Sequence, residues 1–177
     1  ITLRDSDWLW TNAEVSLTEL PYPALEGNYQ LQNASAVLHV ISILQKGGFN
    51  VSDDAIRKGL STVKLAGRFQ RIAGNVEVIL DVTHNQQGAN NLARLLTEIP
   101  AQGQTFAVLG MLKDKDAKSI GITLNQSIDK WFAASLDGAR GMSSEELAEQ
   151  LQPSVNIKSI MMFADVDLAY KQAMIEA

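Results

Sequence analysis

The sequence has 177 residues, 46% of them hydrophobic, with a formal net charge of −5 and no cysteine, so one domain or two small ones can form a genuine core. The acidic balance gives no general attraction to nucleic acid or to an anionic membrane, and the lack of cysteine excludes a disulfide framework and a cysteine-based zinc site. No apolar run approaches the roughly 18 residues that span a bilayer, and the amino terminus lacks a signal-peptide pattern. We therefore expect a cytoplasmic protein without nucleic-acid or membrane partners.

The amino-terminal part of the chain combines strand and helix signals. β-Branched and aromatic residues predict strands up to about Leu20, because the two prolines that follow shortly afterwards cannot continue a central strand. Apolar residues recur at helical spacing from Tyr29 to the double glycine at 47–48, which predicts a helix that ends there. Ser52 is expected to cap a short helix that extends to about Leu60.

The chain changes character near Ala66, where we place the boundary between two domains. Gly67 and Gly74 bracket a strand-like run, and an "AGN" turn joins it to the next strand, which predicts a hairpin. Strands and helices then alternate. The expected strands are 76–81, 105–111, 130–135 and 157–163, and the expected helices are 87–98, 115–127, 143–151 and one from 165. This alternation indicates βαβ crossovers and an α/β, Rossmann-like, mainly parallel sheet with helices on both faces.

The stretch "VEVILDVTHNQQGANNL" places a carboxylate, an imidazole and an amide where a strand ends and a helix begins. Ligands of open α/β sheets bind at the carboxyl ends of the strands, so Asp81 is placed to accept both hydroxyl protons of a ribose. The alternative is that Asp81 or Thr83 only caps the following helix. His84 can orient a substrate carboxylate or carry a proton, or be an ordinary hydrogen-bonded loop residue, and Asn85 has the same ambiguity.

Two further polar groups lie earlier in the chain. Arg68, in "GRFQ", stands beside a glycine at the expected domain junction, where a guanidinium can bind a phosphate through two hydrogen bonds. Most surface arginines have no such role. Gln30 and Asn33 are three residues apart in the first helical turn and face the same side, where an amide can bond an adenine edge or a phosphate, or simply cap the turn.

Two loops follow the later strands. The loop "GMLKDKD" is expected to be solvated, to lie at the same sheet edge as Asp81 and to line the substrate entrance. In "LDGARGMSSEEL", Ser143 and Glu146 have capping-box spacing, which is sufficient explanation for that segment. The sequence contains neither G-x-G-x-x-G after the strand nor a G-x-x-x-x-G-K-[ST] loop, and no clustered metal spacing. These absences argue against a dinucleotide oxidoreductase of the standard kind and against a triphosphate-binding loop, and they leave no metal ligand to assign in this chain.

Five segments taken in order resemble the carboxyl-terminal part of the folylpolyglutamate synthases, in particular the bacterial bifunctional form that is also a dihydrofolate synthase, within the Mur ligase superfamily. They are "LPYPALEGNYQLQNA", "LAGRFQ", "ILDVTHN", "GMLKDKD" and "LDGARG". The resemblance covers nearly the whole chain. It implies that residues 1–65 end a central ATPase domain and that 66–177 form a Rossmann-like carboxyl-terminal ligase domain, truncated at its end. The family usually continues "HNP" where Gln86 follows Asn85, and often has His in place of Tyr29.

The resemblance implies an ATP-dependent ligase that adds L-glutamate to dihydropteroate or to the glutamate tail of folates through an acyl phosphate. By similarity, Asn33 and Arg68 would contact the adenine and phosphates of ATP, Asp81 its ribose, and His84 would lie toward the glutamate. The phosphate loop and the Mg²⁺ ligands are expected outside this chain, which by itself would be inactive and monomeric. The alternatives are a muramyl peptide or cyanophycin-type ligase, and a non-catalytic nucleotide-binding α/β module.

Overall fold

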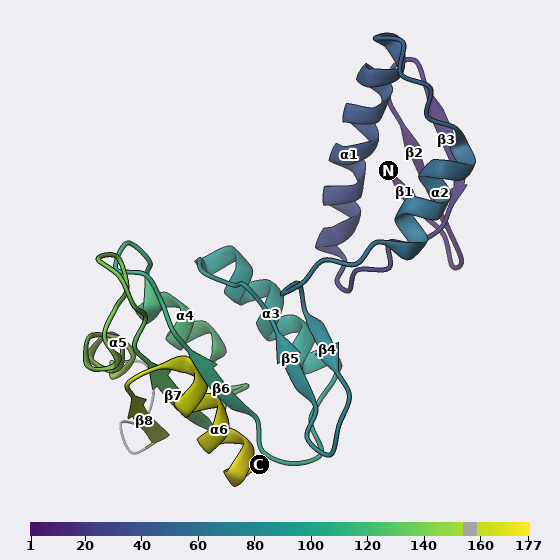
Figure 1. The fold of residues 1–177 in the computed structure, drawn as a ribbon. Helices are drawn as coiled ribbons and strands as arrows, with labels where there is room; N and C mark the ends of the chain where they lie inside the picture. Colours follow the sequence, from purple (N-terminus) through teal and green to yellow (C-terminus); the bar gives the residue numbers. More distant parts are fainter. Residues whose placement is uncertain (154–158) are drawn as a thin grey trace. The chain divides into compact units, whose positions relative to one another are not determined.

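The computed structural model describes residues 1–153 and 159–177, which form two compact units, Ile1–Gln70 and Arg71–Ala177 (Figure 1). The expected strand at 157–163 therefore begins outside the described residues. The first unit has one sheet and one buried core, and the second unit has two sheets and two buried clusters.

The first unit contains an antiparallel three-stranded sheet in the order β1-β2-β3 and two helices. Its elements are β1 (Thr2–Leu3), β2 (Trp8–Thr11), β3 (Ser16–Leu20), α1 (Tyr29–Lys46) and α2 (Asp53–Thr62). The predicted end of the strands at Leu20 is confirmed. Ser52 caps α2 as expected, because its side chain accepts a hydrogen bond from the backbone N–H of Ala55.

The core of the first unit is built around the two tryptophans of β2. Trp8 is fully buried and Trp10 is 3% exposed. Each indole N–H has a partner, since Trp8 Nε1 donates to the Pro21 carbonyl at 2.9 Å and Trp10 Nε1 donates to Ser35 Oγ at 3.0 Å. A buried indole needs such a partner, because leaving its N–H unsatisfied costs the full desolvation penalty. The bond to Ser35 ties β2 to α1.

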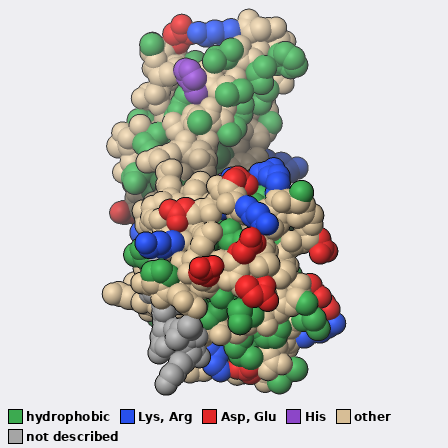
Figure 2. All heavy atoms as spheres, turned by 90° about the vertical axis from the view of Figure 1, so that its left-hand side faces the viewer, with side chains coloured by type: hydrophobic (Ala, Val, Ile, Leu, Met, Phe, Trp, Pro, Cys, Tyr) green, Lys and Arg blue, Asp and Glu red, His purple; other side chains and the backbone are tan. Residues whose placement is uncertain are grey.

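The helix α1 is apolar on more than one side. Leu31 and Leu38 are buried in the core, whereas Val37, Val40 and Ile43 are each about half exposed. Figure 2 shows hydrophobic side chains on this side of the first unit. The apolar spacing thus correctly predicts the helix, but it does not distinguish the face that packs within this unit from the one that stays exposed.

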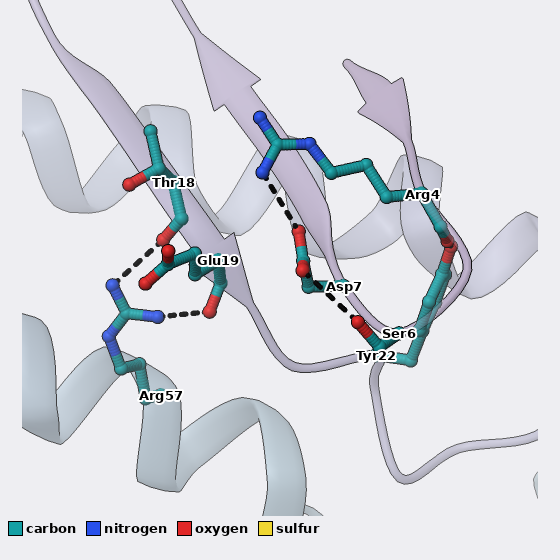
Figure 3. Close-up of polar contacts among 7 residues, drawn as sticks. All are labelled: Arg4, Ser6, Asp7, Thr18, Glu19, Tyr22 and Arg57. Atoms are coloured by element: carbon teal, nitrogen blue, oxygen red, sulfur yellow. Dashed lines mark hydrogen bonds and ion pairs between the residues drawn. The ribbon is translucent and has the colours of Figure 1, made fainter.

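Arg57 joins α2 to the end of β3 (Figure 3). Its Nη2 donates to the Thr18 carbonyl at 2.8 Å, and its Nη1 donates to the carbonyl of Glu19. Glu19 has a left-handed backbone with φ of 53°, which is unfavourable for a residue with a Cβ. The guanidinium therefore satisfies two carbonyls at a strained position within β3, where the pairing with β2 is irregular. In the same view, Arg4 forms an ion pair with Asp7 at 3.5 Å.

The second unit is a Rossmann-like α/β structure. Its strands are β4 (Gln70–Ile72), β5 (Val78–Leu80), β6 (Phe106–Leu109), β7 (Lys130–Ala134) and β8 (Ile160–Phe163), and its helices are α3 (Gln86–Glu98), α4 (Ala117–Leu124), α5 (Ser144–Leu151) and α6 (Val166–Glu176). The strands β6, β7 and β8 pair in parallel in that order. The predicted α/β class and the alternation of strands and helices are confirmed.

One expectation about the sheet is wrong. The alternation predicts that the strand at 76–81 joins the parallel sheet, but β5 pairs instead with β4 in a separate two-stranded sheet. The short connection after β4 brings these two strands together as the predicted hairpin partners, because a local pairing costs little loop entropy. Consistent with a strand that is not covered on both sides, Leu80 is 43% exposed.

The strand β7 lies at the centre of the parallel sheet and is buried on both faces. Trp131 and Ala133 point to one face, where α4 and α5 supply Ile120, Leu124, Leu147 and Leu151. Phe132 points to the other face, where α6 covers it and its ring lies 5.8 Å from that of Phe163. Adjacent strand residues face opposite sides, so this continuous apolar run requires helices on both faces. That predicted arrangement is confirmed.

The helix α5 begins with the predicted capping box. Ser143 Oγ accepts from the Glu146 N–H at 3.2 Å, and Glu146 Oε2 accepts from the Ser143 N–H at 2.8 Å. Two of the N–H groups at the helix start are thereby satisfied. This cap fixes the point at which the loop after β7 ends.

We predict that Phe132→Ala lowers the free energy of unfolding of the second unit by about 3 to 5 kcal/mol, because the Phe132 ring is fully buried and its removal leaves a cavity in the core. Urea unfolding followed by circular dichroism measures the change. Met162→Ala on β8 is the control, since Met162 is 55% exposed and its truncation should change stability by less than about 0.5 kcal/mol. Equal effects of the two substitutions would contradict this assignment of the core.

Candidate functional site

A surface pocket of about 440 Å³ lies at the carboxyl ends of β5, β6 and β7. It is lined by residues 81–84 and 108–112 together with Lys115, Leu136 and Arg140. All of these residues belong to the second unit. The pocket thus lies at the sheet edge where open α/β folds bind their ligands, and it contains both Asp81 and His84.

The orientation of Asp81 is fixed by its own loop. Its Oδ1 accepts hydrogen bonds from the backbone N–H of Thr83 at 2.9 Å and from Thr83 Oγ1 at 2.5 Å. The following helix, α3, is capped by Asn85, whose Oδ1 accepts from the Gly88 N–H at 2.8 Å. The alternative in which Asp81 or Thr83 caps α3 is therefore wrong. Asn85 is therefore the residue that caps α3. Asp81 does not cap the helix, and its carboxylate lines the pocket.

His84 is exposed and held by its backbone neighbour. Its Nδ1 lies 2.9 Å from the carbonyl oxygen of Val82. A carbonyl can only accept a hydrogen bond, so this contact assigns the proton to Nδ1. In the neutral ring Nε2 is then the acceptor, and when the ring is charged it becomes a donor. The imidazole can therefore contact an amine or a carboxylate that enters the pocket.

The loops that follow β6 and β7 are joined by backbone hydrogen bonds. The N–H of Met142 donates to the Met111 carbonyl at 2.9 Å, and the N–H of Lys113 donates to the Arg140 carbonyl at 2.9 Å. Between these bonds Leu112 and Gly141 form an antiparallel bridge. The pairing gives one wall of the pocket a fixed backbone, although the wall comes from two separate loops.

Gly141 makes this close approach possible. A Cβ atom at this position would lie 1.9 Å from the carbonyl oxygen of Leu136, far inside van der Waals contact with backbone. The same loop reverses at Gly138, where φ is 89°. Only glycine fits at Gly141, because any side chain would force the two loops apart.

Three charged residues of these loops form a cluster. Asp114 Oδ1 lies 2.9 Å from Arg140 Nη2, and its Oδ2 lies 3.0 Å from Lys115 Nζ. The hydrogen bond from Arg140, followed by that from Lys115, lowers the pKa of Asp114 to about 2. Lys115 and Arg140 line the pocket. Neither is among the site residues predicted from the sequence, although both follow strand ends and the rule used for Asp81 would have found them.

Asn33 and Arg68 lie in the first unit. Asn33 Nδ2 donates to Gln30 Oε1 at 2.9 Å, so the prediction that these amides share one side of the helix is confirmed. Arg68 is exposed and stands between Gly67 and Phe69, which both have left-handed backbones, with φ of 69° and 47°. That Asn33 and Arg68 act with Asp81 on one ligand stays a prediction.

Within residues 1–153 and 159–177, no three His, Asp or Glu side chains gather as they would around a metal ion. The expectation that the metal ligands lie outside this chain stays a prediction. In the same ranges, none of the helices has the length and apolar content required to span a bilayer.

Comparison with known proteins places this α/β unit in a family. Residues 67–177 match the family described as Mur ligase, glutamate ligase domain. The curated dihydrofolate synthase/folylpolyglutamate synthase of Escherichia coli (strain K12) is 34% identical over 172 residues, covering 97% of this chain and 39% of that protein. The chain thus spans about two fifths of the length of this relative.

Solved structures agree with this comparison. E. coli FolC in complex with DHPP and ADP matches with a TM-score of 0.79 at 35% identity, over 99% of this chain and 39% of that chain. A bifunctional folylpolyglutamate synthase/dihydrofolate synthase with Mn, AMPPNP and L-glutamate bound matches with a TM-score of 0.77 at 37% identity, over 97% and 39%.

The parallel sheet, with helices on both faces and a pocket at its carboxyl edge, gives the second unit the architecture of a Rossmann-like domain. The chain belongs to the Mur ligase family, of which residues 67–177 are the glutamate ligase domain.

We predict that Asp114 titrates in the folded protein with a pKa of about 2, well below its ordinary value of 3.8. Because the folded-state pKa is lowered, the stabilisation from this carboxylate is fully present above about pH 3.8 and is lost as the pH falls through about 2. Carboxyl ¹³C shifts followed by NMR measure the midpoint. Arg140→Ala should raise it more than Lys115→Ala, since Arg140 is the larger cause; an unchanged midpoint in both variants would contradict the cluster.

We predict that Gly141→Ala lowers the free energy of unfolding by about 1 to 3 kcal/mol, because the new Cβ collides with the Leu136 carbonyl and breaks the pairing of the two loops. Amide shifts of Met111 and Met142 should change with it in NMR spectra. Gly103→Ala is the matched control, since nothing lies within 4 Å of a Cβ built there. A stability loss no greater than that of the control would contradict the proposed packing.

Proposed function

We propose that this chain is the carboxyl-terminal part of an ATP-dependent ligase that adds L-glutamate to dihydropteroate or to the glutamate tail of folates. The proposal rests on one observation above all: the carboxyl edge of the parallel sheet in a Mur ligase glutamate ligase domain carries a pocket that contains both Asp81 and His84. Folate substrates are favoured over muramyl peptide or cyanophycin precursors because the relatives described above are dihydrofolate and folylpolyglutamate synthases.

The reaction proposed for the whole protein has two balanced steps. A carboxylate oxygen of the folate substrate takes the γ-phosphoryl group of ATP, which releases ADP and forms an acyl phosphate. The amine of L-glutamate then attacks the acyl carbon, phosphate leaves, and the amine loses a proton as the amide forms. Such chemistry depends mainly on positioning the reactants and on balancing phosphate charge. The residues of this chain would therefore act by binding and orientation.

The residues of the second unit fit part of this task. Asp81 presents a carboxylate in an orientation fixed by Thr83, and a carboxylate can accept the hydroxyl protons of a ribose. His84 lines the same pocket with its proton on Nδ1, so Nε2 can face the incoming amino acid. We propose that Asp81 binds the ribose of ATP and that His84 lies toward the glutamate.

Two residues of the first unit, Arg68 and Asn33, are the other candidates for contacts with ATP. Arg68 lies between two left-handed residues, and Phe69 is one of them although it carries a large, buried side chain. A strained turn of this kind persists only where the surrounding structure holds it, and such turns are common at binding sites. This supports a fixed backbone at Arg68, from which its side chain can reach a ligand. We propose that the guanidinium binds a phosphate of ATP and that the Asn33 amide contacts the adenine.

We propose no ligand of the divalent cation within this chain. ATP is expected to be used with a divalent cation, Mg²⁺ in our proposal, and the relative described above was solved with Mn. The described residues hold no group of His, Asp and Glu that fits such an ion. We propose that its ligands, and the phosphate loop, belong to a part of the protein outside this chain. We propose a monomeric enzyme.

The test uses a full-length enzyme that contains this chain and measures phosphate release that depends on L-glutamate. We expect Arg68→Ala and Asp81→Asn each to reduce kcat/KM for ATP by about 10- to 100-fold, which corresponds to the loss of a hydrogen bond to a charged group. His84→Ala should instead raise KM for glutamate.

The controls are Arg71→Ala and Arg94→Ala, two arginines that already pair with Glu77 and Glu98 and do not line the pocket. Both should leave kcat/KM for ATP within about twofold of the wild type. Unchanged turnover in both the Arg68 and the Asp81 variants would refute the assignment. Nucleotide binding that glutamate and folate do not influence, without turnover, would indicate a non-catalytic module instead.

A further inference from the structure

We propose that Gln86 is a positioning residue, which holds two sides of the pocket at a fixed separation through a hydrogen bond to Thr123. One side is formed by residues 81–84, which precede α3, and another by residues 108–112 and Lys115, which precede α4. Gln86 is the first residue of α3, and Thr123 lies near the end of α4. This inference rests on the proposed function, because it concerns how the reactants of that ligase would be brought together.

The amide group of Gln86 uses both of its N–H donors. Its Nε2 lies 2.5 Å from Thr123 Oγ1 and 3.0 Å from Asn90 Oδ1. Asn90 is one turn further along α3, so this bond keeps the Gln86 side chain against its own helix and leaves the second N–H for α4. The contact joins two residues that are 37 positions apart in the sequence.

The Thr123 hydroxyl is oriented to accept this bond. It donates to the Ser119 carbonyl, one turn earlier in α4, at 2.9 Å. A hydroxyl has one proton and two lone pairs, so a lone pair remains to accept from Gln86. Ser119 in turn donates its backbone N–H to Asp116, the residue that caps α4, at 2.9 Å. The bonds therefore lead from the start of α3 to the residue that follows Lys115 in the pocket loop.

The link adds a directional constraint to an apolar contact between the two helices. Ala89 of α3 and Ile120 and Leu124 of α4 belong to one buried cluster. The hydrophobic effect that holds this cluster is not directional, whereas a hydrogen bond weakens steeply as its angle and distance change. The bond is made at the start of α3, two residues after His84, so its constraint acts directly beside the pocket.

The place of Gln86 in the helix allows this link to be tested apart from the helix itself. Asn85 caps α3, so Gln86 occupies the first helical position, where the backbone N–H has no partner within the helix and proline is well tolerated. Asn85 has an extended backbone, with φ of −149° and ψ of 169°, which suits a residue before proline. Gln86→Pro would therefore keep the start of α3 and remove only the link.

The test measures kcat, KM for ATP and KM for L-glutamate in the full-length enzyme. Gln86→Ala, Gln86→Pro and Thr123→Val should each lower kcat by about three- to tenfold, while both KM values stay within about twofold. Each reactant would still bind, but the two sides of the pocket would no longer hold the reacting groups in line. A role in stability alone would not produce this split between kcat and KM.

Two further variants identify the bond itself. Thr123→Ser keeps the hydroxyl, so its kcat should stay within about twofold of the wild type. The double variant of Gln86→Ala and Thr123→Val should be no slower than either single variant, because both substitutions break the same bond.

Gln87→Ala is the matched control. Gln87 is exposed in the same helical turn, does not line the pocket, and its side chain makes no hydrogen bond with residues 1–153 or 159–177. Its kcat should not change. Melting temperatures within about 2 °C of the wild type would show that the variants are folded. If Gln86→Pro does not fold, Gln86→Ala and Thr123→Val carry the test.

The outcomes separate this inference from the proposed function. A wild-type enzyme without glutamate-dependent phosphate release would remove the proposed function, and this inference with it. An active wild type whose Gln86→Ala and Thr123→Val variants keep the normal kcat would remove this inference alone. So would a Gln86→Pro variant with normal kcat, because the start of α3 would then be all that Gln86 provides.

Discussion

The backbone pairing between the loops that follow β6 and β7 is the interaction on which the candidate site depends. Loops at the edge of a sheet usually move more than the strands that they follow. Here two N–H to carbonyl bonds and the bridge between Leu112 and Gly141 convert the loops into one wall. Lys115 and Arg140 belong to this wall, so the backbone pairing of the loops determines where these two positive charges lie in the pocket.

The sheet beneath this wall supplies the rigidity that the loops require. β7 is buried on both faces, with Trp131 packed against α4 and α5 and Phe132 packed under α6. A shift of β7 by one residue would move each of its side chains to the opposite face of the sheet. Trp131 and Phe132 would then no longer fit the helices that pack against them, so the register is fixed. The start of the loop after β7 is therefore fixed by the core, and its end is fixed by the capping box of Ser143 and Glu146.

Local patterns in the sequence were sufficient for most of the fold. Helical spacing predicted α1, capping residues predicted the starts of α2 and α5, and the alternation of strands and helices predicted the α/β class. These features are set by neighbouring residues, so they can be read without the rest of the chain. The hairpin of β4 and β5 was predicted, but the separation of β5 from the parallel sheet was not, because a strand-like run does not specify which further strands it will pair with. For the same reason the spacing within α1 did not show that Val37 and Val40 stay exposed.

By itself, the sequence determined the class of the fold, the strand end that carries Asp81 and His84, and the resemblance to folate ligases, since each depends on residue type and order along the chain. Only the tertiary structure showed that Asn85, not Asp81, caps α3, and that Lys115 and Arg140 meet at Asp114. Arg140 is 26 residues from Asp114 in sequence. Contacts over such separations follow from the parallel order of β6 and β7 and from the close approach that Gly141 permits, which no local pattern encodes.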